Sequence, residues 1–389
     1  MKLLKVISSM DPKTGGPSQG IRNINPLLIK SGIEVEVLCL DNPSSNNNDS
    51  VLIHTIGQGK TSFQYHHGLK KWIIKNASQF DFIVIHGIWQ YHNYAIYKAL
   101  KVIKRKGMKI PKVVIMPHGM LDPYFQKSLD RKFKAIRNEI IWRLTEKRAI
   151  NAAEAIFFTC QEELELARTT FEGYHPKREI NVGYGIQRPP NYTNEMKIAF
   201  EKCCPSVKEK KYWLFLSRIH PKKGIDVLIK AYNELILEGH DLPELVIAGP
   251  TESSYAQKMI ALAKANSNIH FSGMLSGDRK WGVFYNCEAY LLPSHQENFG
   301  IAIVEAMACK KPVLITKNIN IWREIEQGNG GWILDKPNTV EIKNQLLELA
   351  NLSHEAIELK GQNAFETFEN KFLIDNCYAN FINGLKSLI

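Results

Sequence analysis

The chain has 389 residues, too many for one hydrophobic core, so we expect two domains of roughly 200 residues each. Its composition, 44% hydrophobic and 23% charged, is typical of a soluble globular protein, and no apolar run is long enough to predict a membrane-spanning helix. The formal charge of +11 favours acidic partners such as nucleotide diphosphates, anionic lipids or nucleic acid, without choosing among them.

The seven cysteines are scattered and have no metal-type spacing, since Cys203 and Cys204 are adjacent rather than separated by two residues. An odd, scattered set indicates a reduced compartment. The apolar run Met1–Ile7 is too short for a signal peptide and ends at Ser8. We therefore expect a cytoplasmic protein.

The first half of the chain alternates predicted strands with predicted helices such as Tyr91–Lys106. Pro26 predicts a kink or an early stop in the helix after the first strand. The polar tract Ser44–Ser50 predicts a loop rather than a site. The predicted strands are Leu3–Ser9, Ile33–Leu40, Phe80–His86, Lys112–Met116 and Ala155–Thr159.

The same alternation restarts after Ile186–Asn191, whose two prolines suit a linker. We therefore predict an α/β protein with two Rossmann-like, doubly wound domains, residues 1–188 and 192–371. Ligands of such sheets bind at the carboxyl ends of the strands, so a cleft between two facing domains is the expected site. The predicted strands here are Tyr212–Leu216, Leu245–Ala248, Ile269–Phe271, Ala289–Leu292 and Pro312–Thr316.

Two loops of the first half carry candidate ligand contacts. Gly15 and Gly16 follow the first strand and allow close approach of backbone to a ligand, although a plain tight turn explains them equally well. The segment is not GxGxxG, so a dehydrogenase-type dinucleotide site has little support. His118 lies between Pro117 and Gly119 after the fourth strand, where an imidazole can bond a sugar hydroxyl or a phosphate. His86 is a weaker signal of the same kind.

The second half has a cationic loop after its first strand. Arg218 can fork onto phosphate oxygens and Lys223 supplies a point charge, both just before Gly224 and a predicted helix. This favours a diphosphate site over a solvated basic turn. Backbone groups at Gly273 and Met274 can read the edge of a nucleobase, although an ordinary loop is the simpler interpretation.

The pair Glu297 and Glu305 is the most informative feature. Glu297 lies on the loop after the strand Ala289–Leu292, and Glu305 lies about two turns into a predicted helix, Phe299–Cys309. The helix start between them, at Gly300 and Ile301, suits a phosphate. Two acids beside an anion site favour a sugar or ribose held next to a diphosphate.

The segment Lys127–Ile150 has apolar residues at helical spacing among many cations. We favour a core-packed helix with a solvated basic face. The alternative is contact with a phosphate-rich acceptor or with the inner face of a membrane, as a peripheral protein. Its apolar positions are Phe133, Ile136, Ile140 and Leu144.

Together these motifs resemble glycosyltransferase family 4, the retaining enzymes of GT-B architecture, and more narrowly the branch that builds bacterial surface polysaccharides. The resemblance covers most of the chain. It is carried by Glu297 to Glu305 with Asn298, Phe299 and Gly300 between them, by Ser217, Arg218, Lys223 and Gly224, by Gly15–Ser18, and by Pro117–Pro123.

The resemblance implies roles for these residues. Arg218 and Lys223 would bind the donor diphosphate, Glu305 the ribose, and Glu297 the transferred sugar. Asn298, Phe299, Gly300 and Ile301 would line the donor site, Gly16 would approach the diphosphate, and His118 would contact the sugar. No metal or other cofactor is implied. The last helix, about residues 372–389, would cross back to the first domain, with Tyr378, Phe381, Leu385 and Ile389 as docking residues.

The implied activity is transfer of a hexose from a nucleotide sugar, UDP-glucose first, to a saccharide or lipid-linked acceptor, with the anomeric configuration retained. Two alternatives stay open: a nucleotide-sugar epimerase of the same fold, and a non-catalytic nucleotide-sugar binder. Nucleic-acid binding lacks support, because no basic stretch has interleaved aromatic residues.

Overall fold

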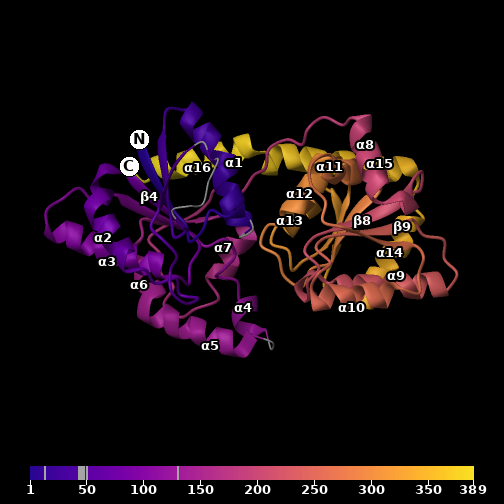
Figure 1. Cartoon of the computed structure of the whole chain (residues 1–389), viewed down its shortest axis with the longest axis horizontal. Helices are drawn as coiled ribbons and strands as arrows, with labels where there is room; N and C mark the ends of the chain where they lie inside the picture. The colour runs from indigo at the N-terminus through magenta and orange to yellow at the C-terminus, as the bar shows by residue number, and fades with distance from the viewer. Residues whose placement is uncertain (13–14, 43–48, 50, 129–130) are drawn as a thin grey trace. The chain divides into compact units, whose positions relative to one another are not determined.

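The computed structural model describes residues 1–12, 15–42, 49, 51–128 and 131–389. The chain forms two compact units, one of residues 1–185 with 374–389 and the other of residues 186–373 (Figure 1). Apart from Asp49, the polar tract Ser44–Ser50 lies outside the described residues, as do Lys13 and Thr14 of the glycine loop.

The first unit is built on a seven-stranded parallel sheet of strand order β3-β2-β1-β4-β5-β6-β7. Its strands are β1 Lys2–Val6, β2 Glu34–Cys39, β3 Leu52–Thr55, β4 Phe82–His86, β5 Lys112–Met116, β6 Ala155–Phe158 and β7 Glu179–Asn181. Its helices are α1 Gly16–Lys30, α2 His67–Asn76, α3 Tyr91–Arg105, α4 Tyr124–Lys127, α5 Lys132–Ile141, α6 Lys147–Ala152, α7 Gln161–Ala167 and α16 Ile374–Lys386.

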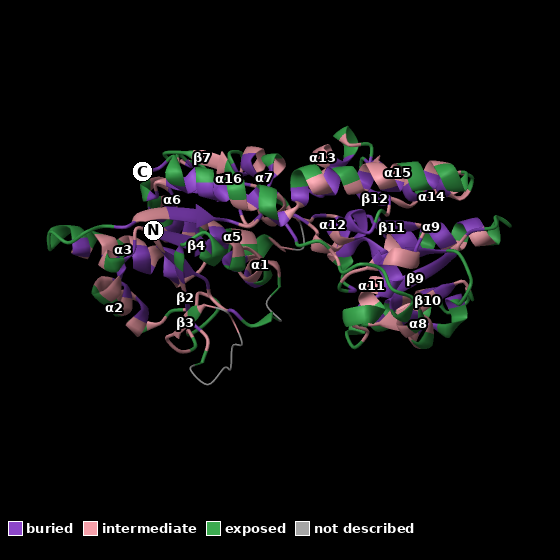
Figure 2. Cartoon of the chain, turned by 90° about the horizontal axis from the view of Figure 1, so that it is seen from above, coloured by how far each residue is buried: buried purple, intermediate pink, exposed green. Residues whose placement is uncertain are grey.

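Both faces of this sheet are buried, because alternate strand residues enter different cores (Figure 2). Ile83 and Ile85 pack in one core with residues of α2, α3 and α7. Phe82 and Val84 pack in the other with Leu28 of α1 and residues of α16. Near-continuous apolar strands of this kind are what a covered parallel sheet requires.

The second unit has a six-stranded parallel sheet of order β10-β9-β8-β11-β12-β13. Its strands are β8 Tyr212–Leu216, β9 Glu244–Ala248, β10 Ile269–Gly273, β11 Ala289–Leu292, β12 Val313–Thr316 and β13 Gly331–Leu334. Its helices are α8 Asn194–Cys203, α9 Ile225–Leu237, α10 Ser254–Ala263, α11 Gly277–Asn286, α12 Ile301–Ala308, α13 Trp322–Gln327, α14 Thr339–Ala350 and α15 His354–Thr367.

Helix α1 continues through Pro26 to Lys30, so the early stop, one of the two expected effects of Pro26, does not occur. Helix α12 begins at Ile301 rather than Phe299, because Gly300 takes a left-handed backbone conformation that ends the loop. Glu305 is therefore about one turn into the helix. The predicted linker Ile186–Asn191 begins at the boundary between the two units, and the Ile186 N–H donates to the Phe372 carbonyl, 3.0 Å away.

The interpretation of Lys127–Ile150 as a helix packed through its apolar stripe was also wrong. The segment forms α5, a π-helical turn Trp142–Glu146 and α6, and all four apolar positions of the predicted stripe are exposed. The buried face instead carries Asn138, Trp142 and Glu146. Within the described residues, no helix has a stretch both long and apolar enough to cross a bilayer.

Helix α16 is part of the first unit although it follows the second in sequence. Phe381 and Leu385 are buried in the core that contains Val84 and Phe157, and the Tyr378 hydroxyl donates to Ser31 Oγ. Ile389 is 81% exposed, so this fourth residue of the expected docking face does not pack.

Candidate active site

In the second unit, the loop that follows β8 and the loop that follows β11 come into close contact at Gly224. This glycine has φ +67°, and a Cβ added to it would lie 1.9 Å from the Pro293 carbonyl oxygen. The His295 N–H donates to the Lys222 carbonyl, 2.8 Å away, which ties the same two loops together. Only glycine fits at position 224, and its close approach brings the cationic loop beside the acidic one.

Lys223 and Glu297 meet at this junction. Lys223 is 8% exposed, and its Nζ donates to Glu297 Oε2. Burial lowers the pKa of Lys223 to about 7, and the nearby charges of Lys222 and Arg218 act in the same direction. The Glu297 carboxylate opposes this shift, because it favours the charged amine. Arg218 itself is exposed, so the site has one buried and one solvent-facing cation.

The backbone of the acidic loop is fixed by the loop after β12. The Glu297 N–H donates to the Asn318 carbonyl and the Asn320 N–H to the Glu297 carbonyl, both at 3.0 Å. The Asn320 amide also donates to Asn298 Oδ1 at 3.1 Å. The sequence interpretation missed Asn318 and Asn320. Their signal was their place just after the predicted strand Pro312–Thr316.

Glu305 lies on α12 and pairs with Lys280 of α11, whose Nζ is 2.5 Å from Glu305 Oε1. Burial raises the pKa of Glu305, and Lys280 partly opposes that rise. Glu305 also lies near Tyr290, whose hydroxyl donates to the Leu216 carbonyl at the end of β8. The carboxylate is therefore held near the carboxyl ends of β8 and β11. No motif in the sequence marks Lys280 as part of the site.

The remaining residues predicted to line the donor site differ in which of their groups can face a ligand. Gly300 caps α12 with φ +72°, and its carbonyl accepts from the Ile303 N–H at 2.9 Å. The N–H groups of Ile301 and Ala302 precede this bond and have no partner inside the helix. Phe299 is buried against Phe372, so only its backbone can face a ligand. Met274 is 74% exposed and follows Gly273, whose carbonyl accepts from the Gly249 N–H.

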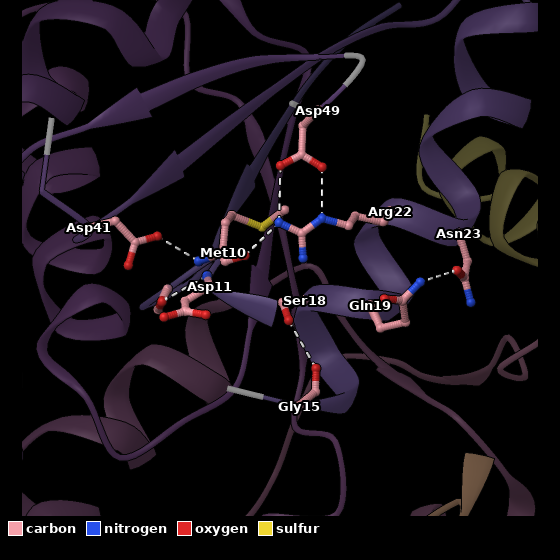
Figure 3. Close-up of polar contacts among 10 residues, drawn as sticks. Met10, Asp11, Gly15, Ser18, Gln19, Arg22, Asn23, Asp41 and Asp49 are labelled. Atoms are coloured by element: carbon pink, nitrogen blue, oxygen red, sulfur yellow. Dashed lines mark hydrogen bonds and ion pairs between the residues drawn. The ribbon is translucent and has the colours of Figure 1, made fainter. Parts of the chain in front are cut away.

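In the first unit, the loop before α1 is anchored by Arg22 (Figure 3). Its guanidinium donates to both carboxylate oxygens of Asp49, at 2.7 and 3.0 Å, and to the Met10 carbonyl. The Met10 N–H donates to Asp41 at 2.6 Å. The backbone of Met10 is thus held at its N–H and at its carbonyl by two residues that the sequence interpretation missed.

Gly15 and Gly16 form the start of α1. Gly15 has φ +99° and its carbonyl accepts from Ser18 Oγ at 2.9 Å (Figure 3). The Gly16 carbonyl accepts from the Tyr184 hydroxyl at 2.8 Å. Gly20, one turn later, lies against the same ring, where a Cβ would be 2.6 Å from ring atoms. The Tyr184 contact fixes the first turn of this helix.

His118 is half-buried and stacks on His86, with ring centroids 5.2 Å apart. His86 Nδ1 and His118 Nε2 are 3.0 Å apart, so one ring must donate and the other accept. Burial lowers the pKa of His118 to about 4 and that of His86 well below its usual range. A pair of neutral imidazoles results, and His118, at φ +53°, is more enclosed than its position between Pro117 and Gly119 indicated.

Lys5 lies beside this pair, around a small cavity of about 40 Å³ that His86, His118 and Tyr184 also line. Its Nζ donates to Asn25 Oδ1 at 2.8 Å, and burial lowers the pKa of Lys5 to about 7. The sequence interpretation passed over Lys5 because a single cation in an apolar strand does not stand out.

Comparison with solved structures identifies the class of protein. The chain aligns over its whole length with HepE of Anabaena in complex with UDP and glucose, with a TM-score of 0.78 and 16% identity. It also aligns with WaaG, a glycosyltransferase involved in lipopolysaccharide biosynthesis, over 98% of this chain and 99% of that one (TM-score 0.65, 17% identity). The fold is therefore that of the GT-B glycosyltransferases.

The family follows from the sequence matches. Residues 14–181 match the family described as Glycosyltransferase Family 4, and residues 200–364 match Glycosyl transferases group 1. The chain belongs to the glycosyltransferase 4 group.

The curated relatives match over part of their length. A capsular polysaccharide biosynthesis glycosyltransferase, CapM of Staphylococcus aureus, is 29% identical over 41% of this chain and 41% of its own. An uncharacterised glycosyltransferase of Methanocaldococcus jannaschii is 28% identical over 43% of this chain and 45% of its own. The matched segments thus span less than half of either relative.

Proposed function

We propose that the chain is a retaining, metal-independent hexosyltransferase. It takes a hexose from a nucleotide sugar, with UDP-glucose favoured, and transfers it to a saccharide or lipid-linked acceptor in surface polysaccharide synthesis. The observation that carries this proposal is the contact between Lys223 and Glu297 at the Gly224–Pro293 junction. It puts a buried cation, an acid and a helix start at the carboxyl edge of one parallel sheet, where such folds bind ligands.

Each side chain has one task in this proposal. Arg218 and Lys223 bind the diphosphate and stabilise the charge that grows on it as the bond from the sugar C1 to phosphate breaks. Glu297 bonds the hexose hydroxyls, and Glu305, held by Lys280, bonds the ribose. The acceptor oxygen forms its bond to C1 on the face that the phosphate leaves, and its proton passes to the departing phosphate.

The first unit contributes Gly16 and His118. Gly16 offers backbone to the diphosphate, and the neutral His118 imidazole bonds a sugar hydroxyl while its Nε2 contacts His86 Nδ1, 3.0 Å away. The names of the similar proteins support a sugar nucleotide and a surface polysaccharide, since HepE was solved with UDP-glucose and CapM is named for capsule synthesis.

The test is an assay of the purified chain with a panel of UDP-, GDP- and ADP-sugars, each with and without saccharide and lipid-linked acceptors. We expect UDP release from UDP-glucose to depend on the acceptor, and magnetic resonance to show the donor's anomeric configuration in the product. Glu297→Gln should lower turnover by about 10²–10³-fold while UDP affinity changes little. Lys230→Met, which removes an exposed cation from α9, is the matched control and should leave turnover unchanged.

Two results would contradict the proposal. An epimerised sugar nucleotide formed without acceptor would make the chain an epimerase. Tight binding of a sugar nucleotide, with no release of the nucleoside diphosphate under any condition, would make the chain a non-catalytic binder.

A further inference from the structure

An exposed apolar stripe runs along α5 and the π-helical turn after it. Its side chains are 90% exposed at Phe133, 59% at Ile136, 53% at Ile140 and 60% at Leu144. Residues three or four positions apart share one helix face, so the four form a continuous strip, called the α5 stripe below. In Figure 1, α5 lies along the lower margin of the first unit.

The opposite face of the same segment fixes this orientation. Trp142 is 1% exposed, stacks on Phe171 at 4.7 Å, and its Nε1 donates to the Glu172 carbonyl at 3.0 Å. Glu146 is fully buried and accepts from Asn93 Nδ2 at 2.9 Å. Turning the helix to bury Phe133 would break these contacts, so the stripe faces outward because its other face is anchored.

The stripe has basic margins. Glu139, an acid of the same segment, pairs with Arg143 at 2.6 Å, and the carboxylate of Glu146 is buried inside the protein. The surface is therefore apolar along its centre and positive along its edges. The exposed cations of the segment are Lys132, Lys134, Arg137, Arg143 and Arg148.

This pattern selects among the surfaces that can cover the stripe. Two copies packed stripe to stripe would bring their basic margins together, which opposes self-association. An apolar strip between rows of Lys and Arg is the pattern of helices that lie in the interface of a bilayer with anionic lipids. Large exposed apolar patches mark interaction sites of this sort.

We propose that the α5 stripe docks the protein on an anionic bilayer surface. The four apolar side chains enter the boundary between headgroups and acyl chains, and the cations contact the headgroups. This inference is independent of the proposed transfer reaction, since it uses no residue of the candidate active site.

The test is flotation of the full chain with phosphatidylcholine vesicles, with and without phosphatidylglycerol. We expect binding to the anionic vesicles, weak binding to the neutral ones, and loss of binding as salt rises. Phe133→Ser with Ile140→Ser should lower the partition coefficient at least about tenfold. Lys132→Gln with Lys134→Gln should also lower it at least about tenfold, because each cation near an anionic surface contributes roughly fivefold.

Matched controls come from the second unit. Leu237→Ser with Leu359→Ser removes two apolar side chains that are 87% and 65% exposed, and should leave partitioning unchanged. Lys230→Gln with Lys258→Gln removes two exposed charges and should also have no effect. Unchanged thermal unfolding of the stripe variants would show that they are folded.

Absence of binding to anionic vesicles, or equal binding by the Phe133 and Ile140 variant, would overturn the proposal. A concentration-dependent dimer in light scattering that disappears in that variant, without vesicle binding, would instead make the stripe an interface between copies.

Discussion

Several ionisable side chains of this protein are wholly or partly held out of water, and burial drives each toward its neutral form. The pKa values of Lys5 and Lys223 fall to about 7, that of His118 falls to about 4, and that of Glu146 rises to about 8. Groups shifted in this way cluster at functional sites, which agrees with the roles proposed for Lys223 and His118. Glu146 has no part in that chemistry, so its burial should affect stability alone.

Glu146→Gln should stabilise the first unit, and more so as pH rises. The folded-state pKa of about 8 lies above the roughly 4.3 of an unfolded glutamate. The folded chain therefore holds more protons between these values, and its free energy of unfolding falls as pH rises through that window. Glutamine does not titrate and still accepts from Asn93, so the gain should reach roughly 4–5 kcal/mol at pH 8.

Denaturant unfolding at pH 5 and pH 8 measures this difference. Glu139→Gln is the control, because Glu139 lies on the preceding helix α5, is 39% exposed in its side chain, and pairs at the surface with Arg143. Its effect should be small and similar at both pH values. A Glu146→Gln gain that is the same at pH 5 and pH 8 would contradict the raised pKa.

At the scale of the elements, the sequence predicted the interior strands and the edge strand β10, and missed three other strands at sheet edges. β3, β7 and β13 all lie at an edge of their sheets. β3 exposes 59% of Leu52, and β7 has only three residues, so neither carries the apolar run that marks a strand buried on both faces. How far a strand is buried depends on its position in the sheet, and the strand order cannot be read from the sequence.

The candidate site was predictable where chemistry falls just after a strand, as at Arg218, Lys223 and Glu297. Partners that come from other elements were not, since Lys280 and Asn320 are joined to the site only by folding. For helix α5, the sequence predicted the wrong face as the buried one. Its apolar period predicted a buried face, but the buried face is the one with Asn138, Trp142 and Glu146.

Gly224→Ala should disrupt the junction of the two site loops. The added Cβ meets the Pro293 carbonyl at 1.9 Å and the residue keeps a positive φ, so we expect a loss of about 2–4 kcal/mol in stability and at least a tenfold loss of UDP affinity. Calorimetric unfolding and UDP titration measure the two effects.

Gly239→Ala is the matched control. Gly239 follows the other end of α9, also has positive φ (+87°), and has nothing within 4 Å of an added Cβ. It should cost only the backbone strain, about 1 kcal/mol, and leave UDP affinity unchanged. Equal behaviour of the two variants would show that the contact with Pro293 does not shape the site.

At the scale of the whole molecule, the last residues of the chain complete the first unit. Phe381 of α16 packs edge-on against Phe157 of β6, with centroids 5.7 Å apart. The first unit therefore lacks part of one core until α16, which follows the second unit in sequence, has been made.

Phe381→Ala should destabilise the first unit by about 3 kcal/mol through the cavity that it leaves. Hydrogen exchange followed by mass spectrometry should show faster exchange in β1, β4 and β6, and unchanged exchange in β8 and β11. Ile389→Ala, at a position 81% exposed, should change stability by less than about 0.5 kcal/mol. An equal increase in the exchange rates of both units would contradict the assignment of α16 to the core of the first unit.

The central claim is that Arg218 and Lys223 hold the diphosphate of a sugar nucleotide beside Glu297. Calorimetric titration of UDP and UDP-glucose into the full chain tests it most directly, with Lys223→Met and Arg218→Ala beside the Lys230→Met control. We expect binding by the unchanged chain and by the control, and at least about a tenfold loss for each site variant, since a charge-assisted hydrogen bond contributes roughly 1.5–3 kcal/mol. Full UDP affinity in the Lys223→Met variant would contradict the account.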